Sequence, residues 1–210
     1  MYNKQQQVIR KGLMAVLCCF GLSHCALLPQ PTTAAKTSSV ISVQLKKQPD
    51  SQFKQVVASF SANSSRNTAF KVISNLSLTQ QWLPEVNSIK TLTVYNYNNF
   101  LLHTILDSPW PFKQRETVTC VTTSFSPSVS KIHIKSCSDR YPQSKDYVRV
   151  QELRSQWIIK QITASRVEIH YQTWLNPQGN VPAFFFNNAL AKQTKQSLSR
   201  LKFLIEQSSD

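Results

Sequence analysis

Glycine is scarce in this chain, since only three of the 210 residues are glycine. The phosphate-binding loops of nucleotide-binding proteins need several glycines at fixed spacing, so the sequence excludes that design and we expect no cofactor. Acidic residues are also scarce, with 10 Asp and Glu against 24 Lys and Arg and a net charge of +14. The basic residues are scattered, which favours a solvated surface, although contact with anionic lipid headgroups is a second interpretation. Interleaved basic and aromatic motifs of the kind that bind nucleic acid are absent, so we expect no nucleic-acid partner.

Long hydrophobic runs are missing as well. The main apolar run, Leu13 to Leu22, is too short to cross a bilayer and follows the basic residues Lys4, Arg10 and Lys11. This layout is typical of a secretory signal, which we place at residues 1–25, with an uncleaved signal anchor as the alternative. Loss of those basic residues lowers the net charge by three, from +14 to +11.

The end of this signal can be read in two ways. Leu22-Ser23-His24-Cys25 resembles a bacterial lipoprotein box, in which Cys25 would be lipidated, but His24 stands where that motif has Gly or Ala. Cleavage after Ala35 is the competing interpretation. We therefore expect an exported, periplasmic protein, either free or anchored through Cys25, with a linker at residues 26–39 rich in Pro, Thr, Ala and Ser.

Cysteine is the next sparse residue, and its distribution agrees with export. Of the five cysteines, only Cys120 and Cys137 lie outside the signal region. Two strand-like segments, 117–125 and 131–137, are joined by a turn near residue 128, and a hairpin centred there places the two cysteines opposite each other on the outward face. We expect a disulfide, with two unpaired thiols as the alternative. A zinc site would need further ligands at suitable spacing, so we expect no metal.

The body of the chain, residues 40–206, has the size and apolar content of one domain. Ser65 and its neighbours are suitable N-caps for a helix through Leu76, and after Pro84 the apolar pattern changes to period two. The expected strands are 40–45, 53–60, 89–95, 100–106, 115–125, 131–137, 147–160 and 166–174, with a break near 154–156 in the seventh. The pattern predicts an α+β fold, in which a largely antiparallel sheet is covered by one late helix.

That late helix follows a turn at Asn176-Pro177-Gln178-Gly179. Pro182 fits the first helical position, where a missing N–H costs nothing, and the helix is expected to run to Glu206. Its buried stripe is expected at Phe186, Leu190, Thr194, Ser197, Leu201, Leu204 and Ile205. The opposite side is expected to carry Lys192, Lys195, Ser199, Arg200 and Lys202. Phe185 and Phe203 fall on the polar side, and residues 207–210 form a short tail.

Several segments together resemble one known family. They are Trp82-Leu83-Pro84-Glu85-Val86, Leu92-Thr93-Val94, Asp107 to Glu116, Val148-Arg149-Val150, Trp157-Ile158-Ile159, and the element from Tyr171 through Asn176-Pro177-Gln178-Gly179-Asn180-Val181-Pro182 to Asn187-Asn188. Their order is similar to that of START-type lipid-transfer domains, bacterial members above all. Asn176 and Glu116 depart from the family pattern, which has Asp at both places.

The resemblance implies a helix-grip fold, in which a curved antiparallel sheet wraps a long C-terminal helix around an internal cavity for one lipid or sterol. It also implies a non-enzymatic, monomeric protein that binds or transfers a hydrophobic ligand. The alternative is a polyketide cyclase-like enzyme that uses the same cavity. That reaction needs converging titratable groups, and the isolated histidines His103, His133 and His170 have no nucleophile or partner motif beside them, so we expect no catalytic residue.

Strand alternation supplies the candidate site. Arg115 shares the inward face with Val121, so we expect it to hold a polar ligand head, with a pair to a surface carboxylate as the alternative. The expected ligand-binding residues are Arg115, Tyr171, Phe186, Leu190, Thr194, Ser197 and Leu201. Thr194 and Ser197 are small and polar at mid-helix, which is where we expect space. The expected portal is formed by Phe184, Phe185 and Trp174, with plain core packing as the alternative.

Overall fold

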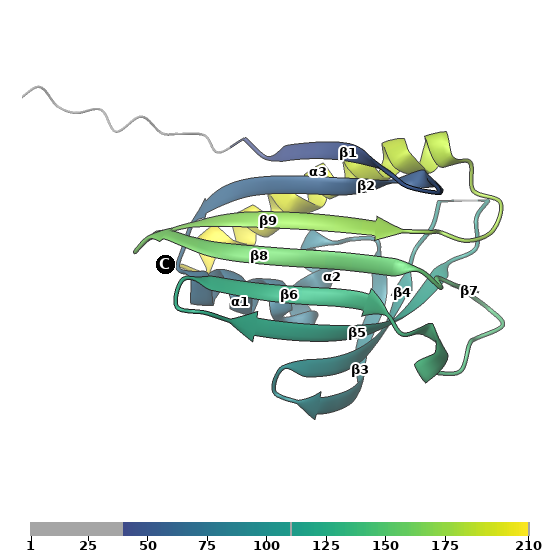
Figure 1. Ribbon diagram of the computed structural model, residues 1–210, viewed down its shortest axis with the longest axis horizontal. Coiled ribbons are helices and arrows are strands. Elements are labelled where there is room, and N and C mark those ends of the chain that lie inside the picture. The colour runs from purple at the N-terminus through teal and green to yellow at the C-terminus, as the bar shows by residue number, and fades with distance from the viewer. Residues whose placement is uncertain (1–39, 110, 210) are drawn as a thin grey trace, which may run out of the picture. The chain divides into compact units, whose positions relative to one another are not determined.

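The computed structural model describes residues 40–109 and 111–209 (Figure 1). The signal peptide, Cys25 and almost all of the linker lie outside the described residues. The chain forms the strands β1 (Ser42–Gln48), β2 (Ser51–Asn63), β3 (Val86–Asn96), β4 (Asn99–Leu106), β5 (Arg115–Phe125), β6 (Val129–Ser136), β7 (Val148–Arg149), β8 (Leu153–Thr163) and β9 (Arg166–Leu175). The helices are α1 (Arg66–Ser74), η1 (Leu76–Leu78), α2 (Thr79–Trp82), η2 (Ser138–Arg140) and α3 (Ala183–Gln207).

The nine strands form one sheet in the order β1-β2-β9-β8-β6-β5-β4-β3. Every pairing along this path is antiparallel, while the short β7 pairs with β5 in parallel. In Figure 1 the sheet curves around α3, with α1 and α2 beside that helix. This is the α+β helix-grip architecture that the sequence predicted. No helix of the described chain has both the length and the apolar character that a membrane span requires.

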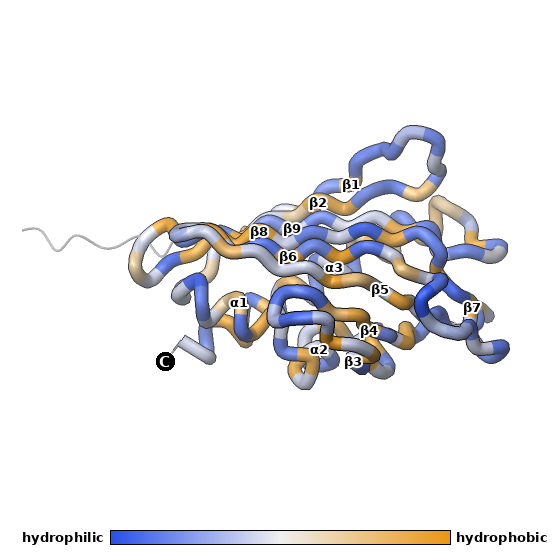
Figure 2. Tube along the Cα trace, turned by 60° about the horizontal axis from the view of Figure 1, so that its bottom comes forward, coloured by the Kyte–Doolittle hydropathy of each residue, from blue (hydrophilic) through white to orange (hydrophobic). Residues whose placement is uncertain are grey.

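Side-chain alternation produces the two faces of the sheet, as the alternating colours along its strands show in Figure 2. The face toward α3, here called the concave face, carries the main core, including Val56, Phe60, Trp157, Ile159 and Ile169. The opposite face is called the outer face.

The early helix begins as expected. Ser65 is the N-cap of α1, and its hydroxyl accepts a hydrogen bond from the backbone N–H of Thr68. The expected break within 147–160 was misplaced. Arg154 and Gln156 read as a polar interruption, but both lie within β8 on the outer face, where polar side chains are ordinary. The break lies instead between Arg149, which ends β7, and Leu153, which begins β8.

The turn before α3 explains how this helix meets the sheet. Gln178 and Gly179 both have positive φ, at 59° and 68°, and Asn176 Oδ1 accepts the Gln178 N–H at 3.1 Å. Pro182 is the N-cap of α3 and not its first helical residue, a difference of one position. Asn187 then fastens the helix to β2, because its side-chain oxygen accepts the Lys54 N–H at 2.8 Å.

Candidate ligand-binding site

The concave face has two halves that differ in packing. At the end where β8 meets β9 in a hairpin, Ile159, Val167 and Ile169 have no exposed surface, and Leu201 and Ile205 of α3 close over this half equally completely. Interiors packed in this way leave no room for a ligand. Any ligand must therefore lie toward the other half.

In that second half, apolar side chains of the concave face remain partly exposed although they point toward α3. They include Phe100, Leu102, Ile134 and Tyr171 of the sheet and Leu190 of the helix. An inward apolar residue that keeps accessible surface is not fully covered by its neighbours. The incompletely covered half of the concave face, from Tyr171 to Arg115, is the candidate site.

An aromatic stack separates the two halves. Trp157 of β8 lies parallel to Tyr171 of β9, with ring centroids 4.1 Å apart, and meets Trp82 of α2 edge to face at 5.9 Å. Burial raises the pKa of the Tyr171 phenol, against hydrogen bonds with Thr173 and Ser155 that lower it. The stack thus gives the candidate site an aromatic floor with one polar atom.

The predicted ligand-binding residues of α3 fall into two groups. Thr194, Ser197 and Leu201 are buried, whereas Phe186 and Leu190 are partly exposed, and the Phe186 ring packs on Phe53 of β2 at 5.3 Å. The stripe also includes two residues that the sequence reasoning left out. Leu198 and Asn187 are buried, while the predicted Leu204 is only partly so.

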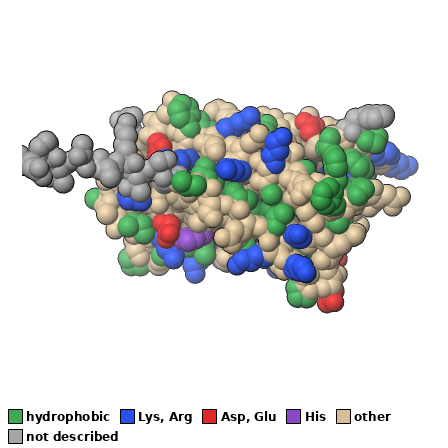
Figure 3. All heavy atoms as spheres, turned by 90° about the horizontal axis from the view of Figure 1, so that it is seen from above, with side chains coloured by type: hydrophobic (Ala, Val, Ile, Leu, Met, Phe, Trp, Pro, Cys, Tyr) green, Lys and Arg blue, Asp and Glu red, His purple; other side chains and the backbone are tan. Residues whose placement is uncertain are grey.

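Exposed aromatic residues stand at both ends of α3. Phe184 is 79% exposed at its beginning, Phe185 follows at 57%, and Phe203 is 60% exposed near its end. Lys192, Lys195 and Arg200 lie exposed between them, and Lys202 pairs with Glu206. Figure 3, seen from above Figure 1, shows cationic side chains scattered among hydrophobic ones with few acidic groups.

Trp174 does not fit the predicted portal. It alternates with the inward residues Tyr171 and Thr173 on β9, so it belongs to the outer face, where it is 7% exposed. Its ring lies under the Arg154 guanidinium at 4.3 Å, and its Nε1 donates to the Phe53 carbonyl oxygen at 3.0 Å. These contacts are those of a packed residue, and we remove Trp174 from the portal.

Arg115 is 8% exposed at the start of β5, and it matches neither sequence interpretation fully. Its Nη1 donates to the Lys113 carbonyl at 2.6 Å and to Ser108 Oγ at 3.0 Å, while Nε donates to the Pro177 carbonyl at 3.3 Å. No carboxylate of the described chain pairs with it. Burial lowers the pKa of the Arg115 guanidinium. The side chain joins the loop before β5 to the turn before α3 and carries a buried, uncompensated charge.

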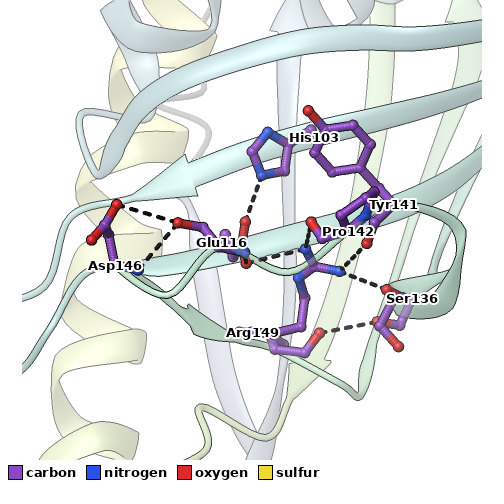
Figure 4. Close-up of polar contacts among 10 residues, drawn as sticks. His103, Glu116, Ser136, Tyr141, Pro142, Asp146 and Arg149 are labelled. Carbon is purple, nitrogen blue, oxygen red and sulfur yellow. Dashed lines mark hydrogen bonds and ion pairs between the residues drawn. The ribbon is translucent and has the colours of Figure 1, made fainter.

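The neighbouring residue, Glu116, takes part in a second buried cluster, on the outer face (Figure 4). Its carboxylate accepts hydrogen bonds from Arg149 Nη2 at 3.1 Å, from the Ser144 N–H at 3.0 Å and from His103 Nε2 at 2.8 Å. Burial alone raises the pKa of the Glu116 carboxyl. The hydrogen bonds from His103 and Ser144 and the charge of Arg149 outweigh that effect and lower it.

Arg149 also fastens the segment 137–149 to the sheet. Its guanidinium donates to the carbonyl oxygens of Ser138, Tyr141 and Pro142. The other end of the segment is held by the predicted disulfide, because Cys120 and Cys137 are bonded. The register differs from the expected one, since Cys120 pairs with Lys135, and the Cys137 N–H donates to the Val118 carbonyl just beyond β6.

Sequence reasoning missed this cluster. Alternation correctly placed Glu116 outward and His103 was expected to be structural or exposed, but neither observation indicated that a later segment would cover them. The hint available in the sequence was Arg149, a charged residue within the otherwise apolar Val148-Arg149-Val150. Phe125 was expected inward and is 52% exposed, because it stands at the end of β5, where only Phe70 packs on its edge.

Comparison with known proteins identifies the class. A family model described as the START domain matches residues 36–203. This chain therefore belongs to the START domain family. Among curated proteins, the uncharacterized protein PA1579 of Pseudomonas aeruginosa is 28% identical over 102 residues, a match that spans 48% of this chain and half of that protein's length.

Solved structures show the same fold at low sequence identity. A STAR-related lipid transfer protein from Xanthomonas axonopodis is 20% identical with a TM-score of 0.72, covering 81% of this chain and 96% of that one. Human STARD10 is 16% identical with a TM-score of 0.72, covering 80% of this chain and 69% of that one. Human StAR-related lipid transfer protein 5 is 10% identical with a TM-score of 0.73, covering 81% and 84%.

Proposed function

We propose that this chain is an exported, non-enzymatic protein that binds or transfers one lipid or similar hydrophobic molecule between its concave face and α3. One observation carries the proposal, namely the inward apolar side chains that stay partly exposed from Tyr171 to Phe100. Burying such surface against a ligand is favourable, by about 25 cal/mol for each Å² of apolar area. Membership of a family with named lipid-transfer proteins supports the same class of ligand.

The position of the titratable groups supports a non-enzymatic role. General acid and base catalysis requires titratable side chains that converge on the substrate. His103 and Glu116 form a hydrogen-bonded pair, but their register places them on the outer face, away from the candidate site. Arg115 is the charged residue at the site itself, and a permanently protonated guanidinium is a poor proton donor.

The experiment uses the full chain, expressed in an exporting bacterial host and purified as the processed protein. Native mass spectrometry of this protein should detect one bound lipid per chain, and extraction should identify it. The mass of the mature protein also reports whether Cys25 is acylated or the chain is cleaved near Ala35. A protein that is empty and takes up no lipid from vesicles would sink the proposal.

A membrane contact through the start of α3 belongs to this proposal. Exposed Phe184 and Phe185 can enter the acyl boundary while Lys192 and Lys195 meet anionic headgroups. We expect the double variant Phe184→Ser/Phe185→Ser to lose most sedimentation with anionic vesicles. Phe203→Ser, at the other end of the same helix, is the matched control and should keep it. Equal losses in both variants would assign the contact to charge or to another surface.

A further inference from the structure

Three threonines stand in a group on the candidate site. Thr104 of β4 lies directly opposite Thr117 of β5, and Thr119 follows two residues later on the same face. All three point to the concave side and are buried, at 8%, 3% and 5% exposure. Two residues along a strand span about 7 Å, so Arg115, Thr117 and Thr119 form a row with that spacing.

The hydroxyls of these three threonines have no hydrogen-bond partner among the residues that the structure describes. Elsewhere on the same face, Ser155 and Thr173 satisfy each other at 2.6 Å. A buried hydroxyl without a partner disfavours folding, and valine has the same shape without that penalty. The packed half of the face follows this rule, because Val56 and Val167 stand there fully buried.

Threonine is common in strands because its branched side chain fits a pleated sheet, which could explain one such residue. It does not explain three unpaired hydroxyls that meet on neighbouring strands beside a buried arginine without a carboxylate. Groups of this kind are satisfied when a bound molecule supplies the missing hydrogen-bonding atoms.

We propose that the ligand carries an oxygen-rich polar segment, such as an acylglycerol unit, which lies along Thr117 and Thr119 and ends at Arg115. Its apolar chain points toward the Trp157 and Tyr171 rings. The inference rests on the proposed function and narrows it. A molecule with a single hydroxyl leaves most of these donors unpaired, so the site discriminates against simple alcohols of the same chain length.

The test compares two single-chain probes, 1-palmitoylglycerol and hexadecanol, by displacement of a fluorescent hydrophobic dye from the full processed chain. We expect the unmodified protein to bind palmitoylglycerol about tenfold more tightly, as two or more neutral hydrogen bonds provide. In Thr117→Val/Thr119→Val the preference should fall to about twofold or less, while hexadecanol binds as well as before. Valine is isosteric and favours strands, so the variant should fold.

Thr122→Val is the matched control, because Thr122 lies on the same strand but exposed on the outer face, where it contacts Asn99. This variant should keep the tenfold preference. Equal affinity of the unmodified protein for both probes overturns the inference and leaves the proposed function standing. Binding of neither probe counts against both, and a preference that survives in the double valine variant shows that the threonines do not create it.

Discussion

Two buried arginines lie on opposite faces of the same sheet, and their surroundings differ. Arg149, on the outer face, is 3% exposed and pairs with the Glu116 carboxylate. Arg115, on the concave face, is 8% exposed and is held by neutral oxygens alone among the described residues. A buried charge with a partner of opposite sign belongs to a closed structural cluster. A buried charge without one can still accept an anionic or polar ligand.

The consequences of removing each arginine should therefore differ in kind. Loss of Arg149 leaves a carboxylate stranded in the interior, whereas loss of Arg115 leaves carbonyls that can turn toward water. The outer cluster should govern stability, and the concave face should govern binding.

The largest effect is expected for Arg149→Met. It leaves Glu116 buried without its guanidinium, which should lower the free energy of unfolding by about 3–5 kcal/mol. Urea denaturation followed by circular dichroism measures this. Arg154→Met is the control, because Arg154 is exposed on β8 and should cost less than about 1 kcal/mol. If both variants lose the same stability, the outer cluster has no special weight.

The disulfide should rank next. Cys120 and Cys137 are separated by 17 residues, a loop for which closure stabilises a protein by about 3 kcal/mol. The variant Cys120→Ser/Cys137→Ser should show that loss in the same denaturation experiment. Because the disulfide and Arg149 hold two ends of one segment, combining the changes should cost less than the sum of the separate losses. Strict additivity would show that the segment 137–149 does not act as a unit.

These clusters also show how far the sequence could be interpreted. Alternation along β5 separated Arg115 from Glu116, placed the cysteines on one face and located the long helix, because those features depend on local periodicity. The hydrogen bonds of Glu116 join residues 13 and 33 positions away, to His103 and Arg149. No local pattern encodes such a contact.

The segment 137–149 illustrates the same limit. It contains the two-residue strand β7, which pairs with β5 in parallel, and it has no apolar periodicity that would reveal which face it covers. The incomplete covering of Phe100 and Leu102 was equally hidden, because the sequence of a strand does not tell how closely a distant helix approaches it. Small residues at Thr194 and Ser197 were a hint of space, yet both are buried.

The next prediction concerns pH and sharpens the assignment of Glu116. Its pKa is lowered in the folded state, so the carboxylate contributes stability above its unfolded pKa of about 4.3 and loses it as the pH falls through the lower folded value. The free energy of unfolding should therefore decrease below about pH 4.3. Glu116→Gln should flatten this dependence relative to Asp139→Asn, an exposed control. An unchanged slope would mean that other carboxylates dominate.

The smallest effect on stability is expected for Arg115→Met, at about 1–2 kcal/mol, because only hydrogen bonds to neutral oxygens are lost. Its effect on the ligand should be large. Native mass spectrometry should show a loss of bound lipid, or a change in the head groups recovered, beyond anything seen for Arg149→Met measured at a temperature where both remain folded. An Arg115→Met protein that keeps the same lipid in the same amount removes the head-group role. Arg115 would then be only a link between two loops, and the contrast between the two arginines would concern stability alone.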